Sequence, residues 1–222
     1  IALLALAGLL ILTRNRGALP ADPLPLARTD DPAVVDDFAC LDQTGAFQRL
    51  SRFGDAAFLV LYVYANGCPI VRQNASELMA LSTAMAERKV RFLCIDPASQ
   101  DSRAAIAAES AALGLTLPIL LDETQCVAEM LGLTRTAEAL IVSTSAPDWR
   151  VRWRGPLDDR AGYGTQKPAA TRAYLREALE ALLAGSAPPS DVPATKGCAL
   201  TLLEPRGRDT IDYASVVAPL LK

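Results

Sequence analysis

The segment AFLVLYVYANGCPIVRQN, residues 57–74, decides the fold of this chain. Its first half, residues 58–64, is a continuous apolar run, which is typical of a central strand covered on both faces. A short turn, residues 65–67, separates this run from Cys68 and Pro69. Pro69 predicts a helix start, because the first helical position needs no N–H donor and favours the φ angle that proline fixes. The segment therefore predicts a strand, a turn and a helix with a cysteine at its N-terminus.

Cys68 is the main candidate for chemistry. Backbone N–H groups and the helix dipole stabilise a thiolate at a helix N-terminus, so this placement favours a reactive thiol. A dithiol redox motif would carry a second cysteine three residues later, where this chain has Val71. Cys68 is therefore either an active thiolate or the remnant of a redox site, and the residues leave both readings open.

The remaining cysteines are interpreted by their contexts. The chain has five cysteines, no CxxC and no histidine, which excludes Cys-His pairs and Ser-His-Asp triads within the sequence and argues against a zinc site. Cys198 lies in an irregular C-terminal segment that could fold back, so it is the candidate disulfide partner of Cys68. The sequence does not determine their connectivity. Cys40, Cys94 and Cys126 lie in apolar contexts and are predicted to be packing residues.

The order of elements predicts the fold class. Apolar runs and helical periodicity alternate along the chain, which implies an α/β fold with a central mixed, mainly parallel sheet flanked by helices. The expected strands are 34–42, 57–64, 90–96, 117–122, 138–143 and 149–155, and the expected helices are 70–88, 101–113, 124–131 and 169–183. Residues 158–160 are interpreted as an ion-pair cluster before the last helix or a partner contact. Trp149 and Trp153 are expected to pack on that helix or to anchor a partner.

The two ends of the chain are interpreted as extensions of a domain at residues 34–185. Residues 1–16 are predicted to be part of a transmembrane signal-anchor helix, although the apolar run alone is shorter than the roughly 20 residues that cross a bilayer. A signal peptide and a short buried helix are the alternatives. Residues 17–33 are a Pro-rich linker, and residues 186–222 form an irregular C-terminal extension. The expected location is the bacterial inner membrane, with the domain in the periplasm.

Five short motifs in order resemble one protein family. They are GCPI (67–70), DPASQDS (96–102), RTAE (135–138), WRGPLDDR (153–160) and KGCAL (196–200). Together they resemble redoxin domains of the alkyl hydroperoxide reductase/thiol-specific antioxidant type, in the thioredoxin superfamily, and most closely the exported bacterial members. The resemblance implies a thioredoxin-like fold over about residues 34–200. In that group a c-type haem domain often follows, and residues 213–221 are similar to its opening. The resemblance therefore implies haem c only in a continuation of the chain, and no cofactor is expected within residues 1–222.

Three positions depart from the family pattern. Peroxiredoxins carry Pro-x-x-x-Thr-x-x-Cys, and Leu61 and Ala65 occupy the Pro and Thr positions here. Because that Thr orients the peroxide, peroxidase activity is not expected. Ala137 occupies the position of the cis-proline that faces the active cysteine in thioredoxins, which puts substrate docking by this loop in doubt.

Two functions follow from these expectations. The first is a non-catalytic accessory subunit with a degenerate redox site, held by its anchor in the lipid bilayer within an integral membrane protein complex, such as one of respiratory or photosynthetic electron transport. The alternative is a thiol–disulfide oxidoreductase that uses Cys68, with Cys198 as the resolving cysteine. The formal net charge of −3 and the pI of about 5.1 give no indication of nucleic-acid binding.

Overall fold

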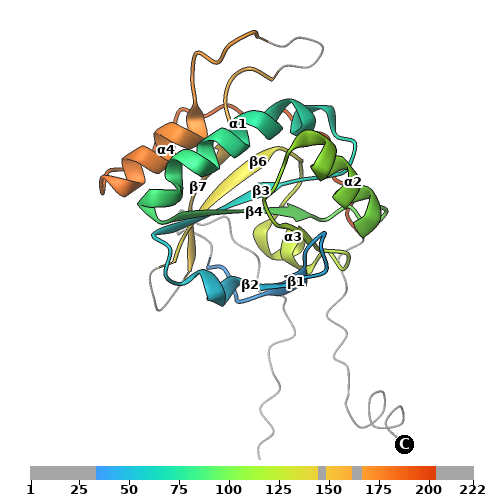
Figure 1. Ribbon diagram of the computed structural model, residues 1–222. Helices are drawn as coiled ribbons and strands as arrows, with labels where there is room; N and C mark the ends of the chain where they lie inside the picture. Colours follow the sequence, from blue (N-terminus) through green and yellow to red (C-terminus); the bar gives the residue numbers. More distant parts are fainter. Residues whose placement is uncertain (1–33, 145–148, 162–166, 204–222) are drawn as a thin grey trace, which may run out of the picture. The chain divides into compact units, whose positions relative to one another are not determined.

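The computed structural model describes residues 34–144, 149–161 and 167–203. The strands are β1 (Ala39–Leu41), β2 (Phe47–Arg49), β3 (Phe58–Val63), β4 (Val90–Asp96), β5 (Ile119–Leu121), β6 (Glu138–Ser143) and β7 (Arg150–Pro156). The helices are α1 (Pro69–Met85), α2 (Arg103–Leu113), α3 (Cys126–Leu131) and α4 (Tyr174–Leu183), with 3-10 turns η1 (Leu50–Phe53) and η2 (Ala86–Arg88). Within this part of the chain, five strands form one sheet in the order β5-β4-β3-β6-β7, and β1 and β2 form a separate hairpin (Figure 1).

The sheet is mixed, as expected, and most of its strands run in the same direction. Strand β4 pairs in parallel with β3 and β5, whereas β6 pairs antiparallel with β3 and β7. A parallel β6–β7 pair is excluded because only residues 144–149 join these strands, and a parallel crossover needs a dozen or more residues. Strands β3, β4, β5 and β7 therefore run in one direction, and within this sheet β6 runs in the opposite direction.

Helices cover both faces of the sheet (Figure 1). On one face α1 and α4 bury Leu78 and Leu179 against the side chains of β3, β4 and β6 that point to that side. On the other face α3 packs Val127 and Leu131 against the alternate residues of the same strands. Because both faces are covered, the central strand β3 is apolar along its whole length, as the sequence predicted.

The last helix begins at Tyr174 rather than at residue 169. The Asp159 carboxylate accepts hydrogen bonds from the backbone N–H groups of Thr171 and Arg172, at 2.9 and 3.2 Å, and so holds the preceding chain outside the helix. Glu177 then accepts the N–H of Ala173 at 3.1 Å, which satisfies a donor at the helix start. Side-chain capping therefore sets a boundary that apolar periodicity alone did not locate.

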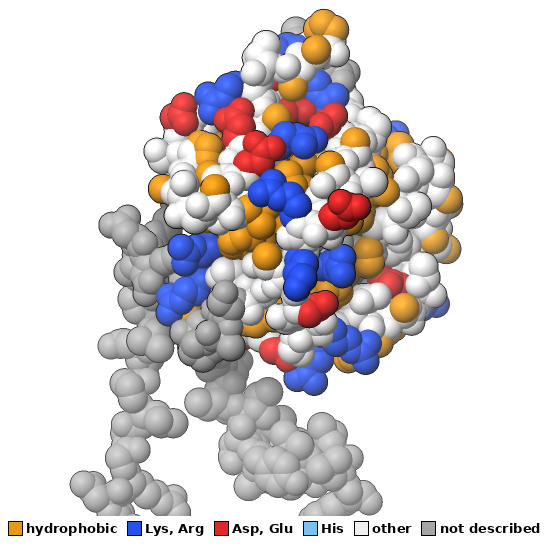
Figure 2. Space-filling view, turned by 60° about the vertical axis from the view of Figure 1, so that its left-hand side comes forward, with side chains coloured by type: hydrophobic (Ala, Val, Ile, Leu, Met, Phe, Trp, Pro, Cys, Tyr) orange, Lys and Arg blue, Asp and Glu red, His pale blue; other side chains and the backbone are white. Residues whose placement is uncertain are grey.

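The predicted ion-pair cluster before α4 is present. Arg160 contacts Asp158 at 2.7 Å, and Lys167 contacts Asp159 at 2.7 Å. The tryptophan prediction was right for one residue: Trp153 packs in the core cluster that includes α4, while Trp149 packs on the opposite face. On the face shown in Figure 2, acidic and basic side chains are interspersed, with apolar side chains between them.

The predicted anchor at residues 1–16, the linker at residues 17–33 and the segment 213–221 lie outside the described residues. Within the described ranges, no helix combines the length and the apolar character that a bilayer crossing requires. The membrane predictions therefore stay predictions.

Candidate functional site

Cys68 lies at the junction between the central strand and the first long helix, as predicted. It occupies the N-cap of α1 with Pro69 as the first helical residue. Its N–H donates to the carbonyl of Ala65 at 3.2 Å, which closes the turn after β3. Gly67 has a φ of +81°, a conformation that glycine adopts without strain. The turn therefore holds Cys68 at the N-terminal end of α1, where the Val71 N–H binds its sulfur.

One carboxylate of α2 holds this turn in place. Glu109 accepts hydrogen bonds from the Tyr64 hydroxyl and the Gly67 N–H, and it forms an ion pair with Arg72 at 2.6 Å. Burial opposes its ionisation, but the bonds from Tyr64 and Gly67 outweigh that effect and hold the pKa of Glu109 below its usual value. The turn that carries Cys68 is thus fastened to the core by an ionised side chain.

The segment that carries Cys198 docks beside this turn. Thr136 N–H donates to the Cys198 carbonyl and Leu200 N–H donates to the Thr134 carbonyl, both at 3.0 Å. These bonds form an isolated antiparallel bridge between Arg135 and Ala199. Residues 196–200, the late KGCAL motif, are therefore fixed against the loop that leads into β6.

Gly197 makes this docking close enough for the cysteines to meet. A Cβ atom built on Gly197 would lie 1.8 Å from the Thr136 carbonyl oxygen, so no larger residue fits without displacing the backbone. Glycine at this position lets the two backbones touch.

The docking brings the two predicted site residues together. The Sγ atoms of Cys68 and Cys198 lie 3.1 Å apart, and both cysteines are free thiols. The Thr136 hydroxyl lies 3.1 Å from the Cys68 sulfur and accepts the Cys198 N–H at 2.9 Å. Sequence reasoning missed Thr136. Thr136 directly precedes Ala137, which occupies the position that faces the active cysteine in the family pattern. This neighbourhood could have identified Thr136 as a site residue.

The two thiols differ in acidity. Burial disfavours a charged Cys68, but hydrogen bonds from the Thr136 hydroxyl and the Val71 N–H outweigh it and hold the pKa of the Cys68 thiol below its usual value. The adjacent Cys68 sulfur raises the pKa of the Cys198 thiol, with burial adding to the effect. The site therefore stabilises one thiolate and assigns it to Cys68.

The other cysteines fall outside the site. Cys94 is fully buried in the core, as predicted, and burial raises the pKa of its thiol. Cys40 is half-buried in β1, where burial raises the pKa of its thiol to about 11. Cys126 was predicted to pack in an apolar context, but it is exposed, because α3 buries Val127 and Ala128 and turns its first residue outward.

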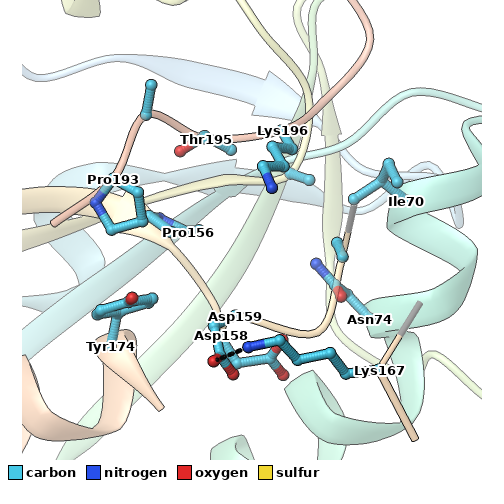
Figure 3. Close-up of a pocket in the computed structure, with 13 residues that line it drawn as sticks. Ile70, Asn74, Pro156, Asp158, Asp159, Lys167, Tyr174, Pro193, Thr195 and Lys196 are labelled. Carbon is cyan, nitrogen blue, oxygen red and sulfur yellow. Dashed lines mark hydrogen bonds and ion pairs between the residues drawn. The ribbon is translucent and has the colours of Figure 1, made fainter. Parts of the chain in front are cut away.

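A cavity of about 260 Å³ adjoins the site (Figure 3). Its lining includes Ala137, the residue after Thr136, and Lys196, two residues before Cys198. In Figure 3, Lys196 and Thr195 lie across the cavity from Asp158 and Asp159. Over the described ranges, no group of three cysteines or carboxylates is arranged to hold a metal ion.

Comparisons with known proteins match this architecture. The chain superposes on an uncharacterized conserved protein from Geobacillus kaustophilus with 27% identity and a TM-score of 0.69, covering 78% of this chain and 92% of the other. A hypothetical protein from Sinorhizobium meliloti gives 25% identity and a TM-score of 0.68, with 76% and 92% covered. A protein described as a DsbE-type thiol:disulfide interchange protein from Chlorobium tepidum is 14% identical with a TM-score of 0.51, over 70% of this chain and 96% of that one, and shares the fold alone.

No curated protein matches the chain. The family assignment rests on a different comparison. The model of the AhpC/TSA family matches residues 32–155, which is more than half of the sequence. The structure adds the strand, turn and Cys-Pro helix start on which the resemblance rested. The chain therefore belongs to the AhpC/TSA family and has a thioredoxin-like fold.

Proposed function

We propose that this protein is a thiol–disulfide oxidoreductase whose redox pair is Cys68 and Cys198. One observation carries the proposal: the two free sulfurs lie 3.1 Å apart although 130 positions separate them in the chain. A small approach of the sulfurs makes a disulfide from this arrangement, because bonded cysteine sulfurs lie about 2.05 Å apart. The docked segment thus supplies the thiol that Val71 does not.

The reaction is a two-electron exchange. The protein's two thiols reduce a partner disulfide: one S–S bond of the partner breaks, the Cys68–Cys198 bond forms, and the partner leaves as a dithiol with the two protons. The reverse reaction oxidises a partner dithiol. No other co-reactant is needed, and either direction passes through a mixed disulfide with the partner.

Peroxide reduction fits the site less well. Ala65 stands where the family's peroxide-orienting Thr would be, and it lies in the turn that Cys68 closes. The hydroxyl beside the Cys68 sulfur belongs to Thr136, which also binds the Cys198 backbone. The Thr136 hydroxyl therefore stabilises a Cys68 thiolate that faces the Cys198 sulfur, an arrangement suited to disulfide exchange. The accessory role in a membrane complex depends on residues 1–33 and stays a prediction.

The proposal is tested by titrating the reduced protein with mixtures of reduced and oxidised dithiothreitol. After acid quenching, alkylation under denaturing conditions counts the free thiols, and peptide mapping locates the bond. We expect two thiols to be lost together and a cross-linked peptide joining Cys68 to Cys198. Cys68→Ser and Cys198→Ser should each abolish the loss, whereas Cys126→Ser should not change it. Oxidised protein that lacks this link at every ratio would refute the proposed function.

A further inference from the structure

The two sulfurs of the redox pair differ sharply in access. Cys68 is 4% exposed, and its sulfur contacts the Thr136 hydroxyl on one side and the Cys198 sulfur on another. Cys198 is exposed. Thiol–disulfide exchange requires the attacking thiolate to reach one sulfur of the disulfide, so access decides which sulfur is attacked.

The backbone that carries the exposed sulfur is also held in place. The Cys198 N–H donates to the Thr136 hydroxyl, and the Cys198 carbonyl accepts the Thr136 N–H. Both backbone groups of Cys198 are therefore tied to the same residue that contacts the Cys68 sulfur. The docked segment cannot move its backbone away from Cys68 without breaking these bonds, and Cys68 is 4% exposed while the segment is docked.

We infer that Cys198 is the sulfur that exchanges with the external partner, and that Cys68 is the covered thiolate that forms and breaks the internal bond. This inference rests on the proposed function and reverses the order expected from the sequence, in which Cys68 attacks and Cys198 resolves. The external partner is a protein or peptide thiol or disulfide that meets the exposed Cys198.

In the oxidising direction, a partner thiolate attacks the Cys198 sulfur. The Cys68–Cys198 bond breaks, its electron pair goes to Cys68 as a thiolate, and a mixed disulfide remains on Cys198. A second partner thiolate attacks the partner's own sulfur in this mixed disulfide. Cys198 leaves with the electron pair and takes up a proton, and the partner departs as a disulfide.

The surroundings of Cys68 favour this order. A thiolate of lower pKa leaves faster, and hydrogen bonds from Thr136 and Val71 stabilise negative charge on the Cys68 sulfur. Attack on Cys198 therefore expels the better leaving group. Attack on Cys68 would expel Cys198, whose thiol has a raised pKa, and would need a path to a covered sulfur. Access and leaving-group stability point to the same sulfur.

The test compares two single-thiol sites in the full chain. Cys68→Ser and Cys198→Ser are each made in a Cys126→Ser background, which removes the other exposed thiol. The reduced variants react with oxidised glutathione at pH 9, where a thiol of ordinary pKa is also largely ionised, so that the rate reports access. Intact mass follows glutathione addition, peptide mapping locates it, and circular dichroism verifies folding.

We expect the Cys68→Ser variant to add one glutathione at Cys198 at least about tenfold faster than the Cys198→Ser variant adds one at Cys68. Equal or faster addition at Cys68 would overturn the inference. If either variant does not fold, the unsubstituted oxidised chain is mixed with reduced glutathione and acid-quenched within milliseconds. The trapped glutathione must then map to Cys198, and mapping to Cys68 overturns the inference. In both cases the internal disulfide of the unsubstituted chain remains the separate test of the proposed function.

Discussion

The two halves of the site are held in different ways. The turn at Cys68 joins β3 to α1 and is fastened by carboxylates, since Glu109 binds the Gly67 N–H and Asp101 binds the Asn66 N–H at 2.7 Å. The segment at residues 196–203 belongs to no helix or strand of the sheet. It is held by the backbone bonds to residues 134–136 and by the Gln125 side chain, which binds Thr201 and Leu203.

Because the two halves are held differently, we assign a different role to each. The turn at Cys68 is the packed half, and it stabilises the thiolate. The N-terminus of α1 and the hydroxyl of the buried Thr136 lie beside the Cys68 sulfur. The docked half supplies the exposed sulfur and determines whether the two sulfurs meet. Substitutions that displace the docked segment should therefore damage disulfide formation most, with little effect on the fold.

The largest effect is expected for Gly197→Ala. The added Cβ would lie 1.8 Å from the Thr136 carbonyl oxygen, so the docked segment must move away from Cys68. We expect formation of the Cys68–Cys198 disulfide to slow by about tenfold or more, because even ~1.4 kcal/mol of lost docking corresponds to that factor. Stopped alkylation during oxidation measures the rate. Gly54→Ala is the matched control, since its Cβ would find its nearest neighbour at 3.5 Å, and an unchanged rate in Gly197→Ala would contradict the docking argument.

The next effect concerns the thiolate itself. Thr136→Val removes the hydroxyl that lies 3.1 Å from the Cys68 sulfur. A hydrogen bond to a charged group contributes about 1.5–3 kcal/mol, so the pKa of Cys68 should rise by about one unit or more. The ultraviolet absorbance of the thiolate as a function of pH measures this shift. Thr136→Ser keeps the hydroxyl and should keep the low pKa, and a Val variant that titrates like the unsubstituted chain would show that Thr136 does not stabilise the thiolate.

A smaller effect is expected at Asp96, the last residue of β4. Burial raises the pKa of Asp96 from 3.8 to about 8, and the nearby Asp101 carboxylate adds to the shift. Between those values the unfolded chain has lost the proton that the folded chain keeps, so this group lowers stability as pH rises from about 4 to about 8. Asp96→Asn removes the loss and retains an oxygen for the Ala98 N–H. Its melting temperature should exceed that of the unsubstituted chain by a few degrees near pH 8 and match it near pH 4.

The control for that measurement is Asp36→Asn, an exposed carboxylate elsewhere in the domain. It should leave the pH dependence of the melting temperature unchanged. Equal melting temperatures of Asp96→Asn and the unsubstituted chain at pH 8 would contradict this prediction. They would mean that burial of the Asp96 carboxyl group does not lower the stability of the folded protein at that pH.

The smallest effect is expected for Cys126→Ser. This thiol is exposed at the start of α3, and among the described contacts it makes none with the sulfurs of Cys68 and Cys198, the proposed redox pair. An exposed substitution of this kind changes the free energy of unfolding by no more than about 0.5 kcal/mol. Chemical denaturation and the disulfide titration should both be unchanged. A shifted redox midpoint would mean that a third cysteine takes part in the exchange.

The sequence by itself determined the framework of this protein. Continuous apolar runs predicted β3, β4 and β6 to within a residue, since strands buried on both faces leave no polar positions. The Cys-Pro step predicted the start of α1, because proline and an N-terminal cysteine each have a physical reason to be there. Cys68 and Cys198 were also named as candidates from local patterns alone.

Only the tertiary structure decided which of these residues come into contact. The meeting of Cys68 and Cys198 depends on backbone pairing between residues 134–136 and 198–200, and neither stretch has a pattern of its own that specifies this partner. The place of Thr136 beside both cysteines, the close fit at Gly197 and the outward turn of Cys126 are likewise contacts between distant segments. Local sequence determines helix and strand propensity and hydrophobic period. Contacts of large sequence separation are fixed by packing of the whole chain, and the meeting of Cys68 with Cys198 is such a contact.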